Sequence, residues 1–302
     1  MRPEKIEFTN QIPLKALVRN VSQYPYHWHD FLEIIQVLKG TVNISIGDDN
    51  LILQEKDIAI INTGELHRIT AGDPDNKILF IQIDPDFYRS ILPDNRYLFI
   101  YCCSPYHEAD IPEKYKEVKE YIARIVRMVN DSCQQEYKEN LENLLREMLI
   151  YITYHFDFLR WGFGTMEFNE KPVERHKQIA EFTRNDQEAN LGLKDMAAAI
   201  DISLQHLSND IKKKFGSTFQ ELLYYGKCEE AAKLLLSTDK HIIDIAMECG
   251  FSDPKYLIKH FKHNFNCTPS AFRKKYRLPE EALAHEAQYR DYPLADVLQY
   301  LE

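Results

Sequence analysis

The sequence predicts an α+β chain of several domains, with an N-terminal β-barrel, a helical hairpin and an all-α C-terminal region. Three observations support this prediction: short apolar runs between turn residues up to about residue 84, helical spacing after Pro112, and an internal repeat in the second half. A length of 302 residues exceeds one typical domain. With 44% hydrophobic and 28% charged residues, the composition is that of a globular protein and argues against wholesale disorder.

The first part of the chain, residues 14–84, consists of short runs rich in Ile, Val and Leu. Glycines such as Gly40 and Gly64 mark the turns between these runs. Many short strands with regular turns are typical of a small β-barrel or sandwich. The expected strands are Phe31–Leu38, Thr41–Ile46, Leu51–Leu53, Asp57–Ile61 and Ile78–Ile83.

Two amphipathic helices are expected next, because apolar residues recur with helical spacing over 115–129 and again over 141–152. A polar stretch at 131–135 separates them, so the pattern predicts a helical hairpin. Its apolar stripes could form a dimer interface or pack on the barrel. Helix-breaking residues over 160–172 indicate a linker, and the acidic last 25 residues could form one more helix around Leu294–Leu301.

An internal repeat relates residues 193–219 to residues 242–272. The segment Asp195-Met-Ala in the first copy matches Asp244-Ile-Ala in the second at an offset of 49, and later matches have an offset of 50. Each copy reads as a helix, a tight turn and a second helix. The second helix of such a helix–turn–helix is the one that enters the major groove of DNA.

The turn residues of each copy fit this interpretation. Gly250 suits a left-handed backbone conformation in the second turn, and Asp201 stands in the equivalent place of the first. A serine then follows in each copy, Ser203 or Ser252, and we expect it to cap the second helix.

The segment from Ile243 to Arg273, IDIAMECGFSDPKYLIKHFKHNFNCTPSAFR, closely resembles the C-terminal signature of AraC-type transcription regulators. The segment GKCEEAAKLLL from Gly226 resembles the helix that joins the two motifs in that family. We expect this helix over Phe219–Ser237, a length of about 28 Å, close to the 34 Å of one DNA turn. Asn266 stands where the family usually has Gly, and Asn is the next-best left-handed residue.

The expected recognition helices carry side chains suited to DNA. Gln205, Ser208 and Asn209 form an exposed strip on the first, and amide side chains suit adenine edges. Lys255 and Lys259 lie four residues apart on the second, and lysine suits guanine acceptors. Further basic residues are better suited to phosphate and would set affinity and salt dependence; these are Lys212, Lys213, Lys262, His263, Arg273 and Lys274.

The charge distribution agrees with a nucleic-acid module in the second half. The net charge of the chain is −10, but residues 171–277 carry 18 Lys and Arg against 14 Asp and Glu, a net charge of +4. The flanking segments 1–170 and 278–302 have net charges of −9 and −5. A basic segment between acidic neighbours favours DNA as the partner of that segment.

A cluster of imidazole and carboxylate side chains stands out in the first half. In the pattern His27-x-His29-x3-Glu33, alternate residues of one strand, Phe31 included, would point together into the barrel. A later turn adds His67. Three histidines and a carboxylate form a complete ligand set for a first-row metal ion.

This pattern resembles the cupin superfamily in its His-x-His-x3-Glu-x6-Gly core and in Gly64-x-x-His67. The sequence departs from the cupin pattern at Val21, Asn62 and Ala71, where Gly, Pro and Asn are usual. AraC-type regulators often carry a cupin-like sensor domain whose pocket receives a small molecule such as a sugar.

Three roles for the cluster stay open at this point. The role we favour is a metal-free effector pocket formed by His27, His29, Phe31, Glu33 and His67. The second is a site for a divalent metal, bound through the same histidines and Glu33. The third is a structural role. No cofactor is required by the first role. A metal-dependent cupin enzyme of the oxygenase or isomerase type, fused to a helical domain, is the alternative function.

The sequence therefore predicts a non-enzymatic, ligand-responsive regulator that binds promoter or operator DNA, senses a small molecule such as a sugar, and forms a homodimer. The expected domains are 1–110 (effector binding), 111–172 (hairpin and linker), 173–277 (DNA binding) and 278–302 (acidic tail). We expect the protein to lie in the cytoplasm and to have no membrane partner. Its six cysteines are scattered without a Cys-x-x-Cys pair, and the sequence shows no signal peptide and no apolar run of membrane length.

Overall fold

The computed structural model describes residues 4–91 apart from 5, 9–11 and 48, residues 100–131 apart from 101, residues 137–156, 218–277 and 287–301, and the single residues 203, 205, 208 and 209. The described residues up to 156 and from 287 onward belong to one compact unit, and residues 218–277 belong to another. No helix among the described residues is long and apolar enough to cross a membrane.

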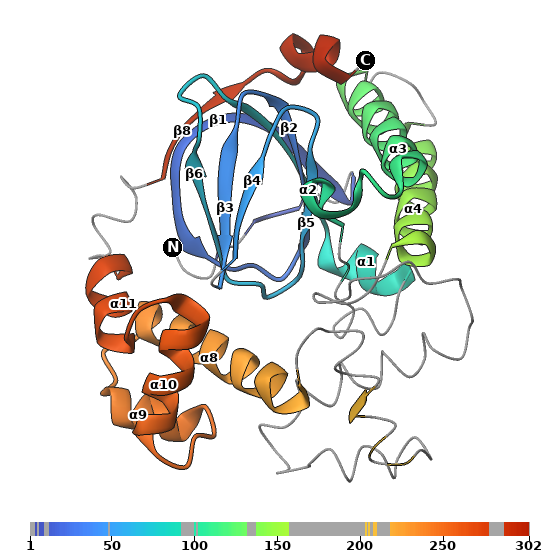
Figure 1. The fold of residues 1–302 in the computed structure, drawn as a ribbon. Coiled ribbons are helices and arrows are strands. Elements are labelled where there is room, and N and C mark those ends of the chain that lie inside the picture. Colours follow the sequence, from blue (N-terminus) through green and yellow to red (C-terminus); the bar gives the residue numbers. More distant parts are fainter. Residues whose placement is uncertain are drawn as a thin grey trace. The chain divides into compact units, whose positions relative to one another are not determined.

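The first unit is a nearly closed antiparallel barrel (Figure 1). Its strand order is β4-β3-β6-β1-β7-β2-β5, with β8 paired to β1 outside this path. This confirms the barrel that the short apolar runs predict. The strands are β1 (Leu14–His27), β2 (Leu32–Lys39), β3 (Val42–Ile46), β4 (Asp49–Leu53), β5 (Ile58–Ile61), β6 (His67–Ala71), β7 (Lys77–Ile83) and β8 (Gln288–Tyr292).

All five of the individually expected strands are present, with ends shifted by one or two residues. Strands β1 and β6 were not expected individually, because polar and basic side chains interrupt their apolar residues. Alternate side chains of the strands fill the barrel with a tightly buried aliphatic core. This core includes Val21, Ile35, Val37, Val42, Ile44, Leu53, Ile61, Ile69 and Ile78.

Helices cover part of the barrel unit. Helices α1 (Pro85–Ile91) and α2 (Ser104–His107) are short, and the long pair α3 (Pro112–Asn130) and α4 (Tyr137–His155) forms the expected hairpin. The predicted apolar stripe of each long helix is buried within this chain. Those stripes therefore stabilise the unit itself and are not free for a partner.

The second unit contains four described helices, α8 (Phe219–Ser237), α9 (Ile242–Glu248), α10 (Pro254–Phe265) and α11 (Pro269–Tyr276). Helix α8 has the bounds that the sequence predicts. It begins with a capping box, in which Thr218 and Glu221 each satisfy the other's backbone N–H. Helices α9 and α10 with their turn form the second helix–turn–helix.

The turn between α9 and α10 confirms one expectation and corrects another. Gly250 has a φ of +72°, in the left-handed region, and Asn266 at the end of α10 has a φ of +54°. The expected capping by Ser252 was wrong, because Asp253 is the N-cap of α10 and its carboxylate accepts the Lys255 backbone N–H at 2.8 Å. Proline is favoured at the first helical position, so Pro254 begins the helix and the residue directly before it, Asp253, is the N-cap.

The acidic C-terminal segment joins the barrel unit. Strand β8 pairs antiparallel with β1, and the expected helix is present as the 3-10 helix η2 (Leu294–Leu301). The chain therefore leaves the barrel unit, forms the second unit, and returns to the barrel unit (Figure 1).

Candidate ligand site and nucleic-acid interface

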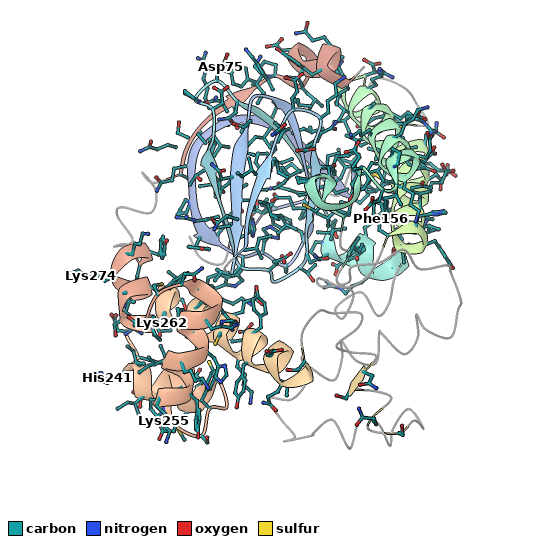
Figure 2. All side chains as sticks on the ribbon, in the orientation of Figure 1. Asp75, Phe156, His241, Lys255, Lys262 and Lys274 are labelled. Atoms are coloured by element: carbon teal, nitrogen blue, oxygen red, sulfur yellow. The ribbon has the colours of Figure 1, made fainter. Side chains whose placement is uncertain are left out.

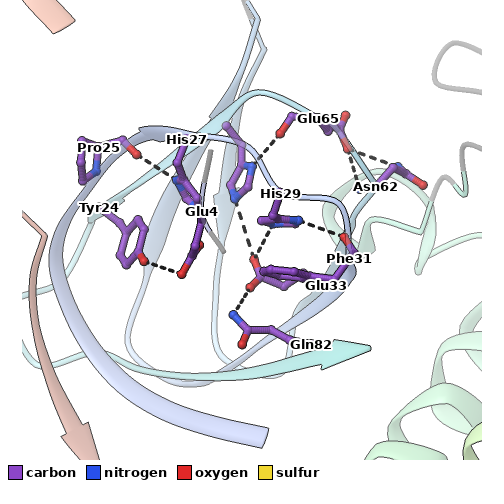
Figure 3. Close-up of polar contacts among 11 residues, drawn as sticks. Glu4, Tyr24, Pro25, His27, His29, Phe31, Glu33, Asn62, Glu65 and Gln82 are labelled. Atoms are coloured by element: carbon purple, nitrogen blue, oxygen red, sulfur yellow. Dashed lines mark hydrogen bonds and ion pairs between the residues drawn. The ribbon is translucent and has the colours of Figure 1, made fainter. Parts of the chain in front are cut away.

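The histidine cluster, defined as His27, His29, Glu33 and His67, is assembled from three strands and a loop (Figure 3). The expectation that residues 27–33 share one strand was wrong. His27 ends β1, His29 lies in the loop that follows, Glu33 is near the start of β2, and His67 begins β6. The prediction that the side chains converge is nevertheless confirmed, since the ligand nitrogens of the three histidines lie within 4.8 Å of one another.

The loop brings His29 into the cluster through backbone contacts. The His29 carbonyl accepts the N–H of Gly64 at 2.7 Å, which ties the β1–β2 loop to the turn before β6. Gly64 has a φ of +74°, a conformation that glycine adopts without strain. In the same turn, the Glu65 carboxylate accepts the Asn62 backbone N–H at 2.8 Å, and this positions the segment that carries His67.

Each histidine is oriented by a backbone carbonyl two residues away. The Nδ1 atoms of His27, His29 and His67 lie 2.9 Å from the carbonyl oxygens of Pro25, Phe31 and Glu65, respectively. A carbonyl oxygen only accepts, so each Nδ1–H donates. In the neutral rings, the lone pair then resides on Nε2, the nitrogen that faces the cluster.

Glu33 supplies the negative charge of the cluster. One of its carboxylate oxygens, Oε1, accepts a hydrogen bond from Gln82 Nε2 at 2.8 Å, as expected for directly paired residues of β2 and β7. The other, Oε2, lies 3.7 Å from His29 Nε2 and 3.8 Å from His67 Nε2, and Glu33 is almost completely buried. The Oε2 atom and His29 Nε2 have no hydrogen-bond partner within normal distance.

The pKa directions agree with an anionic Glu33. Burial alone would raise the pKa of Glu33, but His29, His67 and Gln82 outweigh it and the pKa is lowered. For His29, burial alone would lower the pKa, because it disfavours the charged imidazole. The nearby carboxylates Glu33 and Glu4 outweigh burial, and the pKa of His29 is raised. The site is thus built around one buried negative charge that attracts a proton or a cation.

Sequence reasoning missed three residues that complete the site. Glu4 reaches the cluster from the N-terminal segment, with Oε2 3.3 Å from His27 Nε2. Its Oε1 accepts the Tyr24 hydroxyl at 2.8 Å. Gln82 holds Glu33, as described above. Of these, only Gln82 had a detectable signal, because a buried polar residue in the apolar strand ILFIQI requires a partner.

Phe31, an expected pocket residue, closes one side of the cluster. Its ring stacks on the His29 imidazole at a centroid distance of 3.8 Å and an interplanar angle of 6°. Phe8 contacts the edge of the Phe31 ring at 6.1 Å. An apolar wall of this kind lowers the local dielectric constant and strengthens the attraction between Glu33 and a cation.

The three histidines of the cluster could hold a divalent metal ion. Ligands at about 2.1 Å from one ion lie roughly 3–4 Å apart, which matches the separation of Glu33 Oε2 from two histidine nitrogens. Imidazoles that donate Nδ1–H to carbonyls and present Nε2 are the usual outer-sphere pattern of metal-binding histidines. Three nitrogens and one oxygen suit zinc, iron or manganese.

On the second unit, helix α10 presents the predicted lysines. Lys255, Lys259 and Lys262 are all exposed. Lys255 and Lys262 are labelled in Figure 2. Lys255 is 67% exposed, with its ammonium 3.2 Å from Asp253. The opposite side of the helix is buried through Leu257 and Phe261. The exposed face of α10 is therefore cationic, and the opposite face packs into the unit.

Arg273, for which we expect a phosphate contact, has an additional structural role. Its guanidinium donates to the carbonyls of Lys240 at 2.7 Å and Leu235 at 3.3 Å. These bonds join α11 to the end of α8 and the turn that follows.

In the first motif, Gln205, Ser208 and Asn209 are exposed, and Gln205 Nε2 donates to Asn209 Oδ1 at 3.1 Å. This contact shows that the two amides lie on one face. Lys212 and Lys213 lie outside the described residues.

Comparisons with known proteins identify a family for each of the two parts of the chain. The family model described as AraC-like ligand binding domain matches residues 19–149, and the model described as helix-turn-helix domain matches residues 196–275. Together these matches cover more than half of the chain.

Among relatives, the HTH-type transcriptional regulator YdeC of Bacillus subtilis is 22% identical over 265 residues, which cover 85% of this chain and 88% of YdeC. The HTH-type transcriptional activator RhaS of Mannheimia succiniciproducens is 27% identical over 158 residues, 52% of this chain and 56% of RhaS. Among solved structures, ToxT of Vibrio cholerae is similar with a TM-score of 0.45 and 14% identity, covering 87% of this chain and 98% of ToxT.

A ligand-binding barrel followed by a helix–turn–helix region defines a class of DNA-binding transcription regulators. This chain belongs to the AraC-type family within that class. The helix–turn–helix domain implies DNA as a partner, and the ligand-binding domain implies a small-molecule effector.

Proposed function

We propose that this AraC-type regulator adjusts its binding to promoter DNA according to what occupies the histidine cluster. The observation that carries the proposal is the convergence of three oriented Nε2 atoms and a buried carboxylate inside the ligand-binding barrel. A barrel wall without a ligand would be more stable with apolar side chains in these positions, since burying unsatisfied polar atoms is costly.

For the occupant, we propose a first-row divalent metal ion. The Glu33 Oε2 and His29 Nε2 atoms lie 3.7 Å apart without a hydrogen-bond partner, and a cation between them would satisfy both. The anionic Glu33 provides the compensating charge. This differs from the metal-free pocket that the sequence favours, and the reason is the shared orientation of the three histidines, which only the coordinates reveal.

A sugar or a similar polar metabolite is the second candidate for the effector. Tyr24, Phe31 and Gln82 support it, because aromatic rings and a side-chain amide are common partners of sugar hydroxyls. In that case the histidines and Glu33 would hydrogen-bond to the ligand directly.

Elemental analysis of protein purified without a metal-affinity tag separates these candidates. We expect about one equivalent of metal in the wild type and in the control variant His155→Ala, whose histidine lies on α4 away from the cluster. We expect much less in His29→Ala, because each ligand supplies part of the coordination shell. A metal-free wild type that is stabilised in a thermal-shift screen by a sugar would overturn the metal proposal and support the second candidate.

We also propose that the regulator acts as a homodimer through the hairpin. Because the buried stripes of α3 and α4 are already used, a second copy would contact the outer face of α4, where Ile150 and Tyr154 are 40% and 61% exposed. Light scattering of the double variant Ile150→Glu/Tyr154→Glu tests this. A dimeric wild type and a monomeric, folded variant are expected, and a variant that stays dimeric would contradict this interface.

A further inference from the structure

The C-terminal segment, residues 288–301, forms part of the barrel unit although it follows the DNA-binding region in the chain. Strand β8 pairs with β1 from Val18↔Tyr292 to Gln23↔Gln288. Val18 and Arg19 also pair with β7, so β8 lies along the other edge of β1. Without β8, this edge would expose unpaired backbone groups.

Charged and aromatic side chains hold the segment in place. The Arg19 guanidinium contacts the Asp291 carboxylate at 2.9 Å and lies 4.0 Å from the centre of the Tyr289 ring. The Lys77 ammonium lies 5.0 and 5.1 Å from the rings of Tyr292 and Tyr300. The segment thus docks on two basic residues of the barrel through one ion pair and three aromatic rings.

This docking is limited in strength. Within residues 288–301, all of which the structure describes, Val297 is the one fully buried side chain, and β8 is largely exposed. Segments that bury little apolar surface open at a lower free energy than the core. The segment is therefore suited to reversible attachment.

One residue connects the segment to the histidine cluster. The Tyr24 ring stacks on the Tyr289 ring at 5.8 Å and an interplanar angle of 22°, and it lies 4.5 Å from the His27 imidazole. The Tyr24 hydroxyl donates to Glu4, whose other oxygen contacts His27. Tyr24 is thus held on one side by cluster residues and on the other by the C-terminal strand.

We propose that residues 288–301 form a regulatory strap, whose attachment to β1 is coupled through Tyr24 to the histidine cluster. An occupant that fixes His27 and Glu4 also fixes Tyr24, and this favours stacking with Tyr289. The occupant therefore sets how firmly residues 288–301 are held on β1. This inference rests on the proposed role of the cluster as an effector site, and the coupling is reciprocal.

Hydrogen exchange of the full chain without added metal tests the coupling through the residues alone. The variant Glu4→Ala releases Tyr24 and should raise the exchange rate of amides in residues 288–292 at least about threefold. The control Glu7→Ala removes an exposed carboxylate from the same N-terminal segment and should leave that rate unchanged. Equal exchange in the two folded variants would overturn the proposal.

A second arm adds Zn²⁺ as the probe, with its binding followed by calorimetry. Zn²⁺ should slow exchange of residues 288–292 in the wild type. Tyr289→Ala should abolish this effect and weaken Zn²⁺ binding. The control Gln299→Ala, which removes an exposed side chain of the same segment, should keep both. If Zn²⁺ binds without changing the exchange, the strap is not coupled and the proposal fails. If Zn²⁺ does not bind, the metal proposal fails, and the Glu4 variants decide the coupling.

Discussion

Lysines at neighbouring positions of α10 are expected to differ in what they contact. Lys255 and Lys259 lie toward the N-terminal half of the recognition helix, which in such motifs reaches base edges. Lys262 lies one turn further on, where phosphate contact is expected.

Lys259→Ala should weaken binding to the specific operator more than binding to unrelated DNA, by about 1–3 kcal/mol if the lysine contacts a base edge. Lys262→Ala should weaken both by a similar amount, because phosphate is the same in every sequence. Fluorescence anisotropy with both DNAs at a fixed salt concentration measures the difference. Identical losses for the two variants would mean that Lys259 contacts phosphate.

The backbone of the turn between α9 and α10 also allows a test at a single residue. Gly250→Ala should destabilise the chain by about 1 kcal/mol, because a side chain at a φ of +72° is strained. The nearest atom to the added methyl group would be the flexible end of Lys227 at 3.3 Å, so steric conflict adds little. Asn266→Gly, at the left-handed residue that ends α10, should be neutral or slightly stabilising in urea denaturation. A destabilised Asn266→Gly would show that the Asn side chain has a role of its own.

Among the elements, helix α8 is the one whose stability depends most clearly on the residues at its N-terminus. Thr218 and Glu221 cap one another, and Tyr224 further along the helix stacks on His260 of α10 at 3.7 Å. The cap and this ring contact together fix the helix that separates the two DNA-binding motifs.

Thr218→Ala should reduce the free energy of unfolding by about 1 kcal/mol, since it removes a side-chain acceptor for an N-terminal backbone N–H. Thr218→Ser keeps the hydroxyl and should be close to the wild type. Chemical denaturation followed by circular dichroism measures both variants, and equal stability of Ala and Ser variants would argue that the cap contributes nothing.

At the scale of the whole molecule, the two sites belong to different compact units. The DNA contacts expected here all fall within the helix–turn–helix region, and the histidine cluster falls within the barrel. A substitution in one unit should therefore alter the binding properties of the other unit only through regulation.

We expect His29→Ala to abolish the response to the effector while leaving operator affinity nearly intact, because no expected DNA contact lies in the barrel. Operator binding should be measured by anisotropy with and without effector. A folded variant that responds normally would show that the cluster is not the effector site.

The isolated fragment 173–277 should bind promoter DNA without the barrel, with an affinity that falls steeply as salt rises, since phosphates supply much of the binding free energy. A titration from low to physiological salt measures the slope. A folded fragment that binds no DNA even at low salt would contradict the placement of the interface.

The local pattern of the sequence determined much of this protein. Apolar alternation and turn residues predicted the strands, and helical spacing predicted α3 and α4. The resemblance to AraC-type regulators predicted α8, and Gly250 and Asn266 were correctly expected to be left-handed. These features depend on neighbouring residues, so a local pattern is enough to predict them.

Only the tertiary structure decided how distant segments meet. Glu4 and Gln82 join the histidine cluster from segments far apart in the chain, and the three Nε2 atoms converge because three separate carbonyls orient the rings. The pairing of β8 with β1 was likewise absent from any local pattern, since β8 is short, polar and exposed. Its position depends on the unpaired edge of β1 and on Arg19, about 270 residues earlier in the chain, and a contact of that range becomes visible only when the chain is folded.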